Sequence, residues 1–360
     1  MGIVLLSLVL VVGMAGCARR GSSAGGAAGD KAATFYQGKT ITITTKSSPG
    51  GNGDTTARLL AQYLPDYIPG HPHVVVKNNA GGAGSVMMKN VAQVFPNDGL
   101  NLALPDTAVV LRWMFKQAGS DYPLDKMPII GDVTAPLVVV VRKSAGTDLA
   151  ALQKRAQPLK AGSTAPGGTG VIDMTLGFGL LNIPVKEVYG YSGAGPVALA
   201  LERGEADTAS PAAGAYLSSY KTLSDRGIVY PFYQVGDPGP NNTLVRSPAL
   251  SEFPTLQEVY QQQFGHAPTG PEWNAVLKLA DMVQLGLFLC ARPDTPPAAL
   301  TALRQGFDKM AADDKVKTKL NTTLGGAVSV GNGEAATLLK NLLATSGDLL
   351  TSLENAANGK

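Results

Sequence analysis

Two glycine-rich segments, far apart in the chain, have residue types and spacing suited to binding an anion. Ser48–Gly53 and Ala165–Gly170 both contain the string Pro-Gly-Gly-x-Gly, and each stands between an expected strand and an expected helix. The first N–H groups of a helix have no partner within it, the helix dipole favours negative charge there, and glycine lets a ligand approach the backbone. A second glycine-rich loop follows each segment, at Ala80–Gly84 and Ser192–Gly195. The pattern predicts two similar lobes that hold one carboxylate between them.

The candidate ligand contacts are hydroxyl and backbone donors in and around these loops, with one lysine for positive charge. We expect binding residues at Lys46, Ser47, Ser48, Gly50, Gly51, Asn52, Asp54, Gly82, Asp106, Thr107, Ser163, Thr164, Gly167, Gly168, Thr169, Tyr191, Ser192 and Gly193. Asp54 is interpreted as the N-cap of the first helix, with Arg58 one turn later as its ion-pair partner. If both lobes clamp one ligand, replacing Gly51 or Gly168 by Val should nearly abolish binding. The alternative is that these glycines only allow tight turns.

Nucleotide binding and catalysis have weaker support in this sequence. The phosphate-loop string G-x-x-x-x-G-K-[ST] does not occur, and Thr56 stands where the dinucleotide fingerprint needs its third glycine. Gly190–Ala194 resembles a nucleophile elbow, but its last position is Ala. The histidines are His71, His73 and His266. His71 and His73 flank Pro72 and could form a metal pair, but no carboxylate or cysteine stands near them in the sequence to complete a site. We therefore expect a binding protein without cofactor or metal, and keep a hydrolase as the least favoured alternative.

The N-terminus predicts export and a lipid anchor. Ile3–Met14 is an apolar run of signal-peptide length, and small residues precede Cys17, as in the lipobox of bacterial lipoproteins. We expect a signal peptide at 1–17, lipidation of Cys17, and a flexible tether at 18–34, which would hold the protein on a membrane in the periplasm or elsewhere outside the cytoplasm. A buried N-terminal helix is the alternative.

Two other sequence features limit the reactions and partners that we expect. Cys290 lies in an apolar run and is predicted to be a buried, inert thiol. The net charge is only +3, and no dense cluster of Lys and Arg occurs. Because nucleic-acid surfaces need such clusters, no nucleic-acid partner is expected.

Hydrophobic periodicity predicts an α/β fold with largely parallel sheets. Strands are expected at 40–45, 74–77, 100–104, 137–141, 185–189, 228–232 and 285–289, and helices at 55–64, 85–94, 297–312 and 334–354. A chain of 360 residues is long enough for two domains. We expect lobe 1 at 35–140 plus 236–360 and lobe 2 at 141–235, with crossovers near 140–142 and 234–238.

The order of these motifs resembles the solute receptors of tripartite tricarboxylate transporters, also called the Bug family. The resemblance runs from about 35 to about 320 and is carried by Lys39–Ile43, Pro49–Asp54 with Ala57–Leu60, Val74–Asn78 with Gly81–Gly84, Tyr191–Pro196 and Thr295–Pro297. It implies a type II periplasmic-binding fold, with two Rossmann-like lobes and a cleft between them. It also implies a small organic carboxylate ligand and membrane permease subunits as partners.

Two departures from the family pattern concern the ligand. Val171 and Ile172 stand where the family usually has a polar residue, and Ser192 stands where it usually has Lys. These departures favour a ligand that is unusual for the family. A sensory lipoprotein that presents a bound ligand to a signalling partner is the alternative to a transport receptor.

Overall fold

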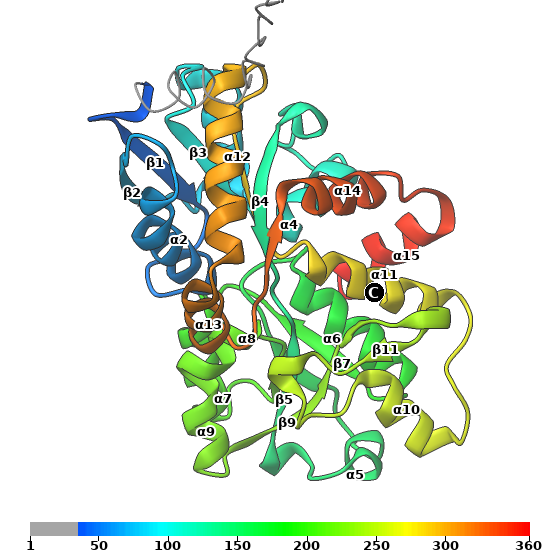
Figure 1. Cartoon of the computed structure of the whole chain (residues 1–360). Coiled ribbons are helices and arrows are strands. Elements are labelled where there is room, and N and C mark those ends of the chain that lie inside the picture. Colours follow the sequence, from blue (N-terminus) through cyan, green and yellow to red (C-terminus); the bar gives the residue numbers. More distant parts are fainter. Residues whose placement is uncertain (1–34) are drawn as a thin grey trace, which may run out of the picture.

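Two mixed β-sheets form the centres of two lobes (Figure 1). The computed structural model describes residues 35–360, so the predicted signal peptide, Cys17 and the tether lie outside the described residues. The first sheet has the order β13-β4-β12-β3-β1-β2 and the second has the order β7-β6-β8-β5-β9. The first comprises β1 (Thr40–Thr45), β2 (His73–Asn78), β3 (Asn101–Leu104), β4 (Ile129–Val133), β12 (Leu287–Cys290) and β13 (Ser329–Gly331). The second comprises β5 (Val138–Arg142), β6 (Leu159–Gly162), β7 (Val185–Val188), β8 (Thr208–Ala209) and β9 (Val229–Gln234).

Helices cover both sheets. They are α2 (Asn52–Tyr63), α3 (Ser85–Lys89), α4 (Thr107–Met114), α5 (Leu149–Gln153), α6 (Thr169–Leu180), α7 (Ala194–Arg203), α8 (Ala213–Ala215), α9 (Lys221–Asp225), α10 (Leu256–Phe264), α11 (Pro271–Gln284), α12 (Pro297–Ala312), α13 (Asp314–Thr323), α14 (Asn332–Leu343) and α15 (Gly347–Ala357). A small hairpin of β10 (Asp237–Pro238) and β11 (Leu244–Val245) stands apart from both sheets. Among residues 35–360, no helix is both long and apolar enough to cross a bilayer.

The expectation of largely parallel sheets was wrong. β1 is parallel to β2 and β3, and β6 is parallel to β7 and β8. In contrast, β12 and β13 are antiparallel to β4, and β5 is antiparallel to β8 and β9. Strands β12 and β13 re-enter the first sheet after the chain has formed the whole second sheet, so no crossover helix fixes their direction.

Two of the predicted helices also differ from the structure. The helix expected at 85–94 is α3 followed by a π-helical segment at Asn90–Val94. The helix expected at 334–354 is two helices, α14 and α15, which are separated near Gly347 with φ of 62°. A positive φ is incompatible with a continuous right-handed helix, and glycine adopts it without strain.

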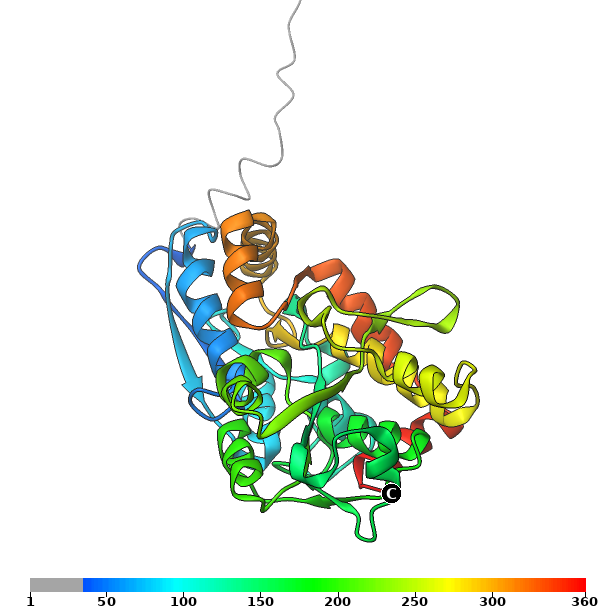
Figure 2. The ribbon, with the colours of Figure 1, turned by 90° about the horizontal axis from the view of Figure 1, so that it is seen from below.

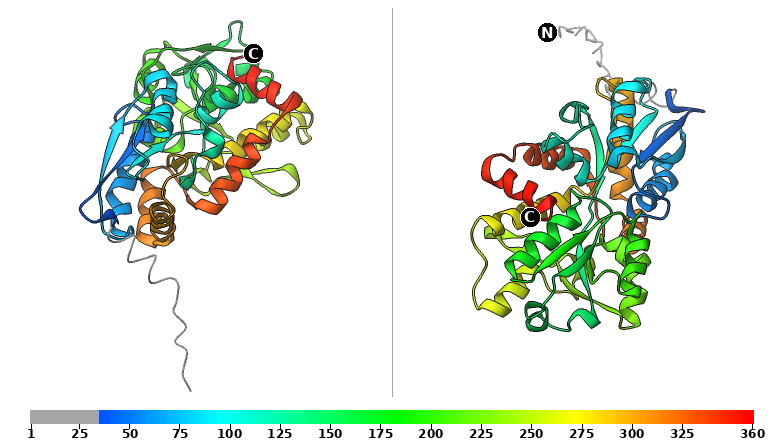
Figure 3. Two further views of the ribbon diagram at one scale, coloured as in Figure 1. Left: turned by 90° about the horizontal axis from the view of Figure 1, so that it is seen from above. Right: turned by 180° about the vertical axis from the view of Figure 1, so that it is seen from behind.

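The C-terminal segment links the two sheets. Helix α12 packs against β4 and β13 of the first sheet, whereas α15 packs against α6, which lies on the second sheet. Helix α11 runs beside α14 and α15, as seen from below in Figure 2 and from behind in Figure 3. The chain therefore crosses between the sheets after β4 and after β9, and contacts the second sheet again at its end. The residue boundaries of the two lobes stay a prediction.

Candidate functional site

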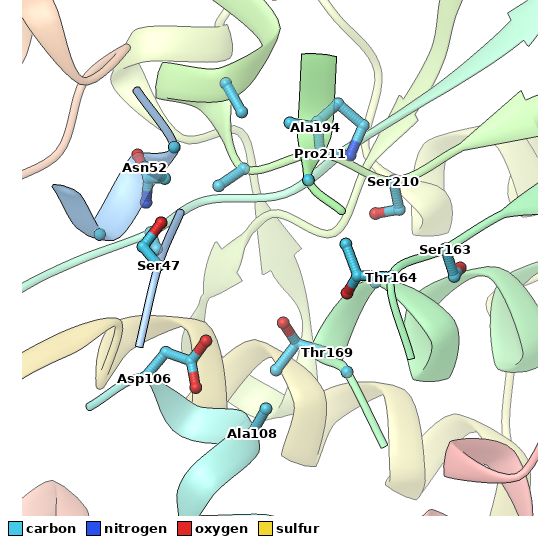
Figure 4. A pocket seen from close by; sticks show the side chains of 18 of the residues that line it. Ser47, Asn52, Asp106, Ala108, Ser163, Thr164, Thr169, Ala194, Ser210 and Pro211 are labelled. Carbon is cyan, nitrogen blue, oxygen red and sulfur yellow. The ribbon is translucent and has the colours of Figure 1, made fainter. Parts of the chain in front are cut away.

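A cavity of about 550 Å³ lies between the two sheets. Its walls come from the segments that follow β1, β3 and β6, from the start of α7, and from the turn after β8. Figure 4 shows Ser47, Asn52 and Asp106 on one side of the cavity and Ser163, Thr164 and Ser210 on the other. Ligands of open α/β sheets bind beyond the carboxyl ends of the strands, which is where this cavity lies.

The first glycine-rich loop makes a tight turn into α2. The Gly51 N–H donates to the Ser48 carbonyl at 3.0 Å, and Gly50 has φ of 78°, a conformation suited to glycine. Gly51 is the N-cap of α2, and no side chain caps this end of the helix. The first N–H groups of α2 are therefore left for a ligand or water.

The second lobe supplies two further helix starts of the same kind. Gly167 has φ of 84°, and α6 begins after Gly168. Helix α7 begins after Gly193, and neither helix has a side-chain cap. Gly51, Gly168 and Gly193 all line the cavity. Three long helices thus direct the positive ends of their dipoles at one cavity, which is the arrangement expected of an anion site.

A fourth helix start at the cavity is already occupied by a carboxylate of the protein. Asp106 is the N-cap of α4 and accepts from the Val109 N–H at 3.3 Å. Its other carboxylate oxygen lies 2.9 Å from Nζ of Lys46, and the two side chains are 35% and 22% exposed. Both residues line the cavity. The positive charge of Lys46 is therefore compensated within the site.

Several cavity hydroxyls donate to protein acceptors. Ser163 Oγ donates to Glu187 at 2.7 Å, and Ser210 Oγ donates to Asp173 at 2.6 Å. Burial raises the pKa of both acids to about 7, although the serine hydrogen bonds oppose this shift. The remaining carboxylate oxygen of each acid is buried without a hydrogen-bond partner. Two buried acids therefore stand directly behind the serines of the cavity wall.

The two lobes also touch at the mouth of the cavity. Ser48 Oγ in the first glycine-rich loop donates to the Ser192 carbonyl at 2.9 Å, across 144 residues of sequence. Thr107, another residue that lines the cavity, uses its hydroxyl within the protein and donates to the carbonyls of Met282 and Leu285. The Thr107 hydroxyl proton is thus used to join α4 to the segment before β12.

The structure brings most of the predicted binding residues together. The cavity is lined by Lys46, Ser47, Ser48, Gly51, Asn52, Asp106, Thr107, Ser163, Thr164, Gly168, Thr169, Ser192 and Gly193. The other predicted residues do not line it: Gly50, Asp54, Gly82, Gly167 and Tyr191. Gly50 and Gly167 make the positive-φ turns that place their neighbours at the cavity.

The interpretation of Asp54 as an N-cap was wrong. Helix α2 begins three residues earlier than expected for such a cap, and Gly51 is its N-cap. The Asp54 carboxylate instead accepts from the Gly50 N–H at 2.9 Å, from Arg58 Nε at 2.9 Å and from Asn78 Nδ2 at 2.9 Å. Burial raises the pKa of Asp54, but these hydrogen bonds outweigh it and hold the pKa below its ordinary value. Asp54 therefore braces the loop from behind, and its predicted ion pair with Arg58 is confirmed.

Sequence reasoning missed the part of the wall that follows β8. Ser210, Pro211 and Ala212 line the cavity, and Ser210 carries one of its hydroxyls. Strand β8 is only Thr208–Ala209, which is too short to give a periodic signal. The apolar wall residue Met174 was missed for another reason, because it lies inside α6, one turn beyond the glycine-rich loop.

The remaining candidate groups lie away from this cavity. His71, His73 and His266 are exposed, and within residues 35–360 no group of three His, Cys, Asp or Glu side chains is arranged to hold a metal ion. Cys290 is fully buried in β12, and burial raises the pKa of its thiol. The prediction of a buried Cys290 is confirmed, and a thiol of raised pKa has little of the reactive thiolate.

Comparison with curated proteins gives one partial match. No model of a known protein family matches the chain. A protein of Agrobacterium vitis, described as "UPF0065 protein in the TAR-I ttuE-ttuC' intergenic region", is 29% identical over 181 residues. The alignment covers 48% of this chain and 51% of that protein, so the chain spans about half the length of the curated relative it matches.

Solved structures match over nearly the whole chain. R. palustris Rpa4515 with adipate has a TM-score of 0.70 and 21% identity, and covers 89% of this chain and 97% of its own. MatC (Rpa3494) of Rhodopseudomonas palustris with bound malate has a TM-score of 0.65 and 19% identity, covering 89% and 99%. The periplasmic binding protein BugD has a TM-score of 0.64 and 18% identity, covering 90% and 97%. The expected two-lobed periplasmic-binding fold is confirmed, and so is the resemblance to Bug proteins as a likeness of fold.

Proposed function

We propose that this chain is a solute-binding receptor of the tripartite tricarboxylate type, which captures a small organic carboxylate in the cavity between its lobes. The observation that carries the proposal is the meeting of three uncapped helix starts, from α2 in one lobe and from α6 and α7 in the other, at one cavity. Two proteins of the same fold were solved with malate and with adipate.

The chemistry of the cavity suits capture and not turnover. A desolvated carboxylate needs several donors at once, and backbone N–H groups at helix starts supply them without a side chain that could react. Each charge-assisted hydrogen bond contributes about 1.5–3 kcal/mol, so a few of them support micromolar binding. Ser163 and Ser210 donate to carboxylates, and no histidine lies beside them to act as a base. We infer that the protein is not an enzyme.

We further propose that the receptor acts outside the cytoplasm, is anchored by a lipid on Cys17, and delivers its ligand to membrane permease subunits. The apolar N-terminal run, the small residues before Cys17 and the glycine-rich tether support this part of the proposal. Replacing Cys17 by Ser should release correctly folded protein from the membrane fraction. A wild-type protein that is fully soluble with an unprocessed N-terminus would contradict the anchor but leave the binding function untouched.

The binding function is tested by identifying the native ligand. Mass spectrometry of protein purified under non-denaturing conditions should show a bound organic acid, and calorimetry with that acid should give a one-to-one complex. A generic ester and amide screen serves as the control, with no turnover expected. Turnover in that screen, or a co-purified ligand without a carboxylate, would refute the proposal.

A further inference from the structure

We infer that the ligand is a monocarboxylate whose far end carries hydrogen-bond donors, an ammonium or hydroxyl groups, and not a second carboxylate. This inference rests on the proposed function and narrows its substrate class. The observation behind it is that Asp106, ion-paired with Lys46, and two serines that already donate elsewhere face the same cavity as the three helix starts.

The charge balance of the cavity fits one negative charge. Among the described residues that line it, the charged side chains are Lys46 and Asp106, which lie 2.9 Å apart and compensate each other. Each helix start carries roughly half an elementary positive charge, so three of them supply about one and a half charges, enough for one carboxylate and too few for two. A second carboxylate would find no uncompensated cation, and it would lie in a cavity that already holds the negative charge of Asp106.

Asp106 can accept more hydrogen bonds than it receives from the protein. An ionised carboxylate has about four lone-pair positions, and the contacts of Asp106 are the Val109 N–H and the Lys46 ammonium. About a third of its side chain is exposed, and Figure 4 shows it directed toward the cavity. The aliphatic part of Lys46 lies close to the backbone of Gly84, which restricts how far the ammonium can move away. The site therefore offers an anionic acceptor at a fixed position.

The serines add acceptors on the opposite wall. The single proton of each hydroxyl points at a buried acid, from Ser163 to Glu187 and from Ser210 to Asp173. While the acids are ionised, the oxygen of each serine presents lone pairs to the cavity, where it accepts from a ligand and does not donate to one. Asp106 and these two serine oxygens are thus acceptors in the cavity wall, beside the hydroxyls of Ser47, Thr164 and Thr169, which can donate or accept. A donor on the ligand therefore finds partners on both walls.

The test compares ligands of equal length that differ only at the far end. Calorimetry at pH 8, above the pKa of about 7 to which burial raises both buried acids, would use butyrate, 4-hydroxybutyrate, 4-aminobutyrate and succinate, and the matching six-carbon series ending in adipate. We expect the amino and hydroxy acids to bind at least about tenfold more tightly than both the plain monocarboxylate and the dicarboxylate of the better-binding length, as one charge-assisted hydrogen bond would give.

Asp106→Asn should reverse this preference. Asn remains a good N-cap for α4, so the helix start is preserved, while the Lys46 charge becomes uncompensated. The variant should lose about tenfold in affinity for the amino acid probe and gain affinity for the dicarboxylate, with the plain monocarboxylate changed by less than about threefold. Asp121→Asn is the matched control, because Asp121 pairs with Lys89 away from the cavity and should leave the ranking unchanged.

The outcomes separate the two proposals. If the dicarboxylate binds most tightly to the wild type, or if Asp106→Asn leaves the ranking as it was, the ligand class is wrong while carboxylate capture stands. If no member of either series binds to folded protein and no carboxylate co-purifies, the proposed function falls and the ligand class falls with it.

Discussion

The two Pro-Gly-Gly-x-Gly loops share a backbone conformation but are supported in different ways. Gly50 and Gly167 have φ of 78° and 84°, and each loop leads into a helix without a side-chain cap. The first loop is held by its own helix, because Asp54 accepts from the Gly50 N–H. The second is held by the end of the chain, because the Gly167 N–H donates to the Ala357 carbonyl at 2.8 Å. The shared string therefore determines the turn, and residues outside it determine what holds the turn in place.

The buried acids that follow the two loops also differ, in the number of donors around them and in their pKa values. Asp54 in α2 is surrounded by donors, and these hold its pKa below the ordinary value despite burial. Asp173 in α6 is fully buried with one serine as its side-chain partner, and burial raises its pKa to about 7. One lobe thus keeps a charged carboxylate behind its glycine-rich loop, and the other keeps an acid that is neutral over much of the acidic pH range.

The largest loss of affinity is expected from a change at Gly170, the last glycine of the second Pro-Gly-Gly-x-Gly segment. A Cβ at Gly170 would lie 2.6 Å from the backbone carbonyl oxygen of Ser210, which cannot rotate away. Gly170→Val should therefore displace the cavity wall and lower carboxylate affinity by at least about a hundredfold, measured by calorimetry with the identified ligand.

Gly168→Val separates blocking of the cavity from displacement of its wall. A Cβ at Gly168 would meet no atom closer than 3.9 Å, so the added Cβ itself displaces no backbone. The variant tests the clamp itself, since Gly168 lines the cavity. Normal binding by this variant, together with lost binding in Gly51→Val, would place the ligand on one lobe only.

Removing the Asp54 carboxylate, which holds the first loop, should cause the next largest loss of affinity. Asp54→Ala leaves the Gly50 N–H without its acceptor and leaves the Asn78 amide with the Ser47 carbonyl alone, so the first loop is held by fewer contacts. We expect affinity to fall about thirtyfold, which corresponds to about 2 kcal/mol and one charge-assisted hydrogen bond. Arg58→Ala is the control, because Arg58 is 58% exposed and exposed ion pairs contribute little, so a change below about threefold is expected.

A smaller loss of affinity is expected when the hydrogen bond from Gly167 to Ala357, which holds the second loop, is disturbed. Ala357 is fully buried at the end of α15, so Ala357→Leu overfills its site and moves its carbonyl away from the Gly167 N–H. Affinity should fall about threefold to tenfold, as for the loss of one neutral hydrogen bond. Asn358→Leu changes an exposed neighbour, and a similar loss in that variant would show that α15 does not support the loop through this contact.

The last prediction concerns the pH dependence of stability, not ligand affinity, and distinguishes the two acids. The pKa of Asp173 is raised from 3.8 to about 7, so the folded state binds a proton that the unfolded state releases, and stability falls as pH rises from about 4 to about 7. Asp54 has the opposite sign, because its lowered pKa makes stability fall as pH falls below its ordinary value.

Thermal unfolding across pH measures this difference. Asp173→Asn should flatten the decline in midpoint between about pH 4 and pH 7, and Asp54→Asn should flatten the decline on the acid side. Equal pH profiles for the wild type and Asp173→Asn would show that Asp173 is ionised in the folded protein.

The sequence predicted the glycine-rich loops well because their chemistry is local. A Pro-Gly-Gly turn, a helix start and nearby hydroxyls follow one another within a few residues, as at Ser47–Asn52 and Ser163–Thr169. The same holds for β5, whose run of valines is buried on both faces. Where local pattern and tertiary environment agree, the strand and the cavity residues were expected in nearly the right places.

Contacts between distant segments could not be predicted in this way. The direction of β12 and β13 depends on where the chain re-enters the first sheet, and the hydrogen bond from Gly167 to Ala357 joins residues that are far apart in the sequence. Asp54 was misassigned because an aspartate near a helix start is typical of an N-cap. Its actual role depends on contacts made in the folded chain, such as the hydrogen bond from Asn78. Ser210 gave no signal, since its strand has two residues.

The hydrogen bond between Ser48 and Ser192 bears on how fast a ligand enters and leaves. It joins two exposed loops of different lobes through neutral groups, and such a bond contributes about 0.5–1.5 kcal/mol. By itself it therefore shifts the ratio of shut to open protein by only about twofold to tenfold. Loss of this bond alone should therefore change the rates of ligand entry and release by no more than about that factor.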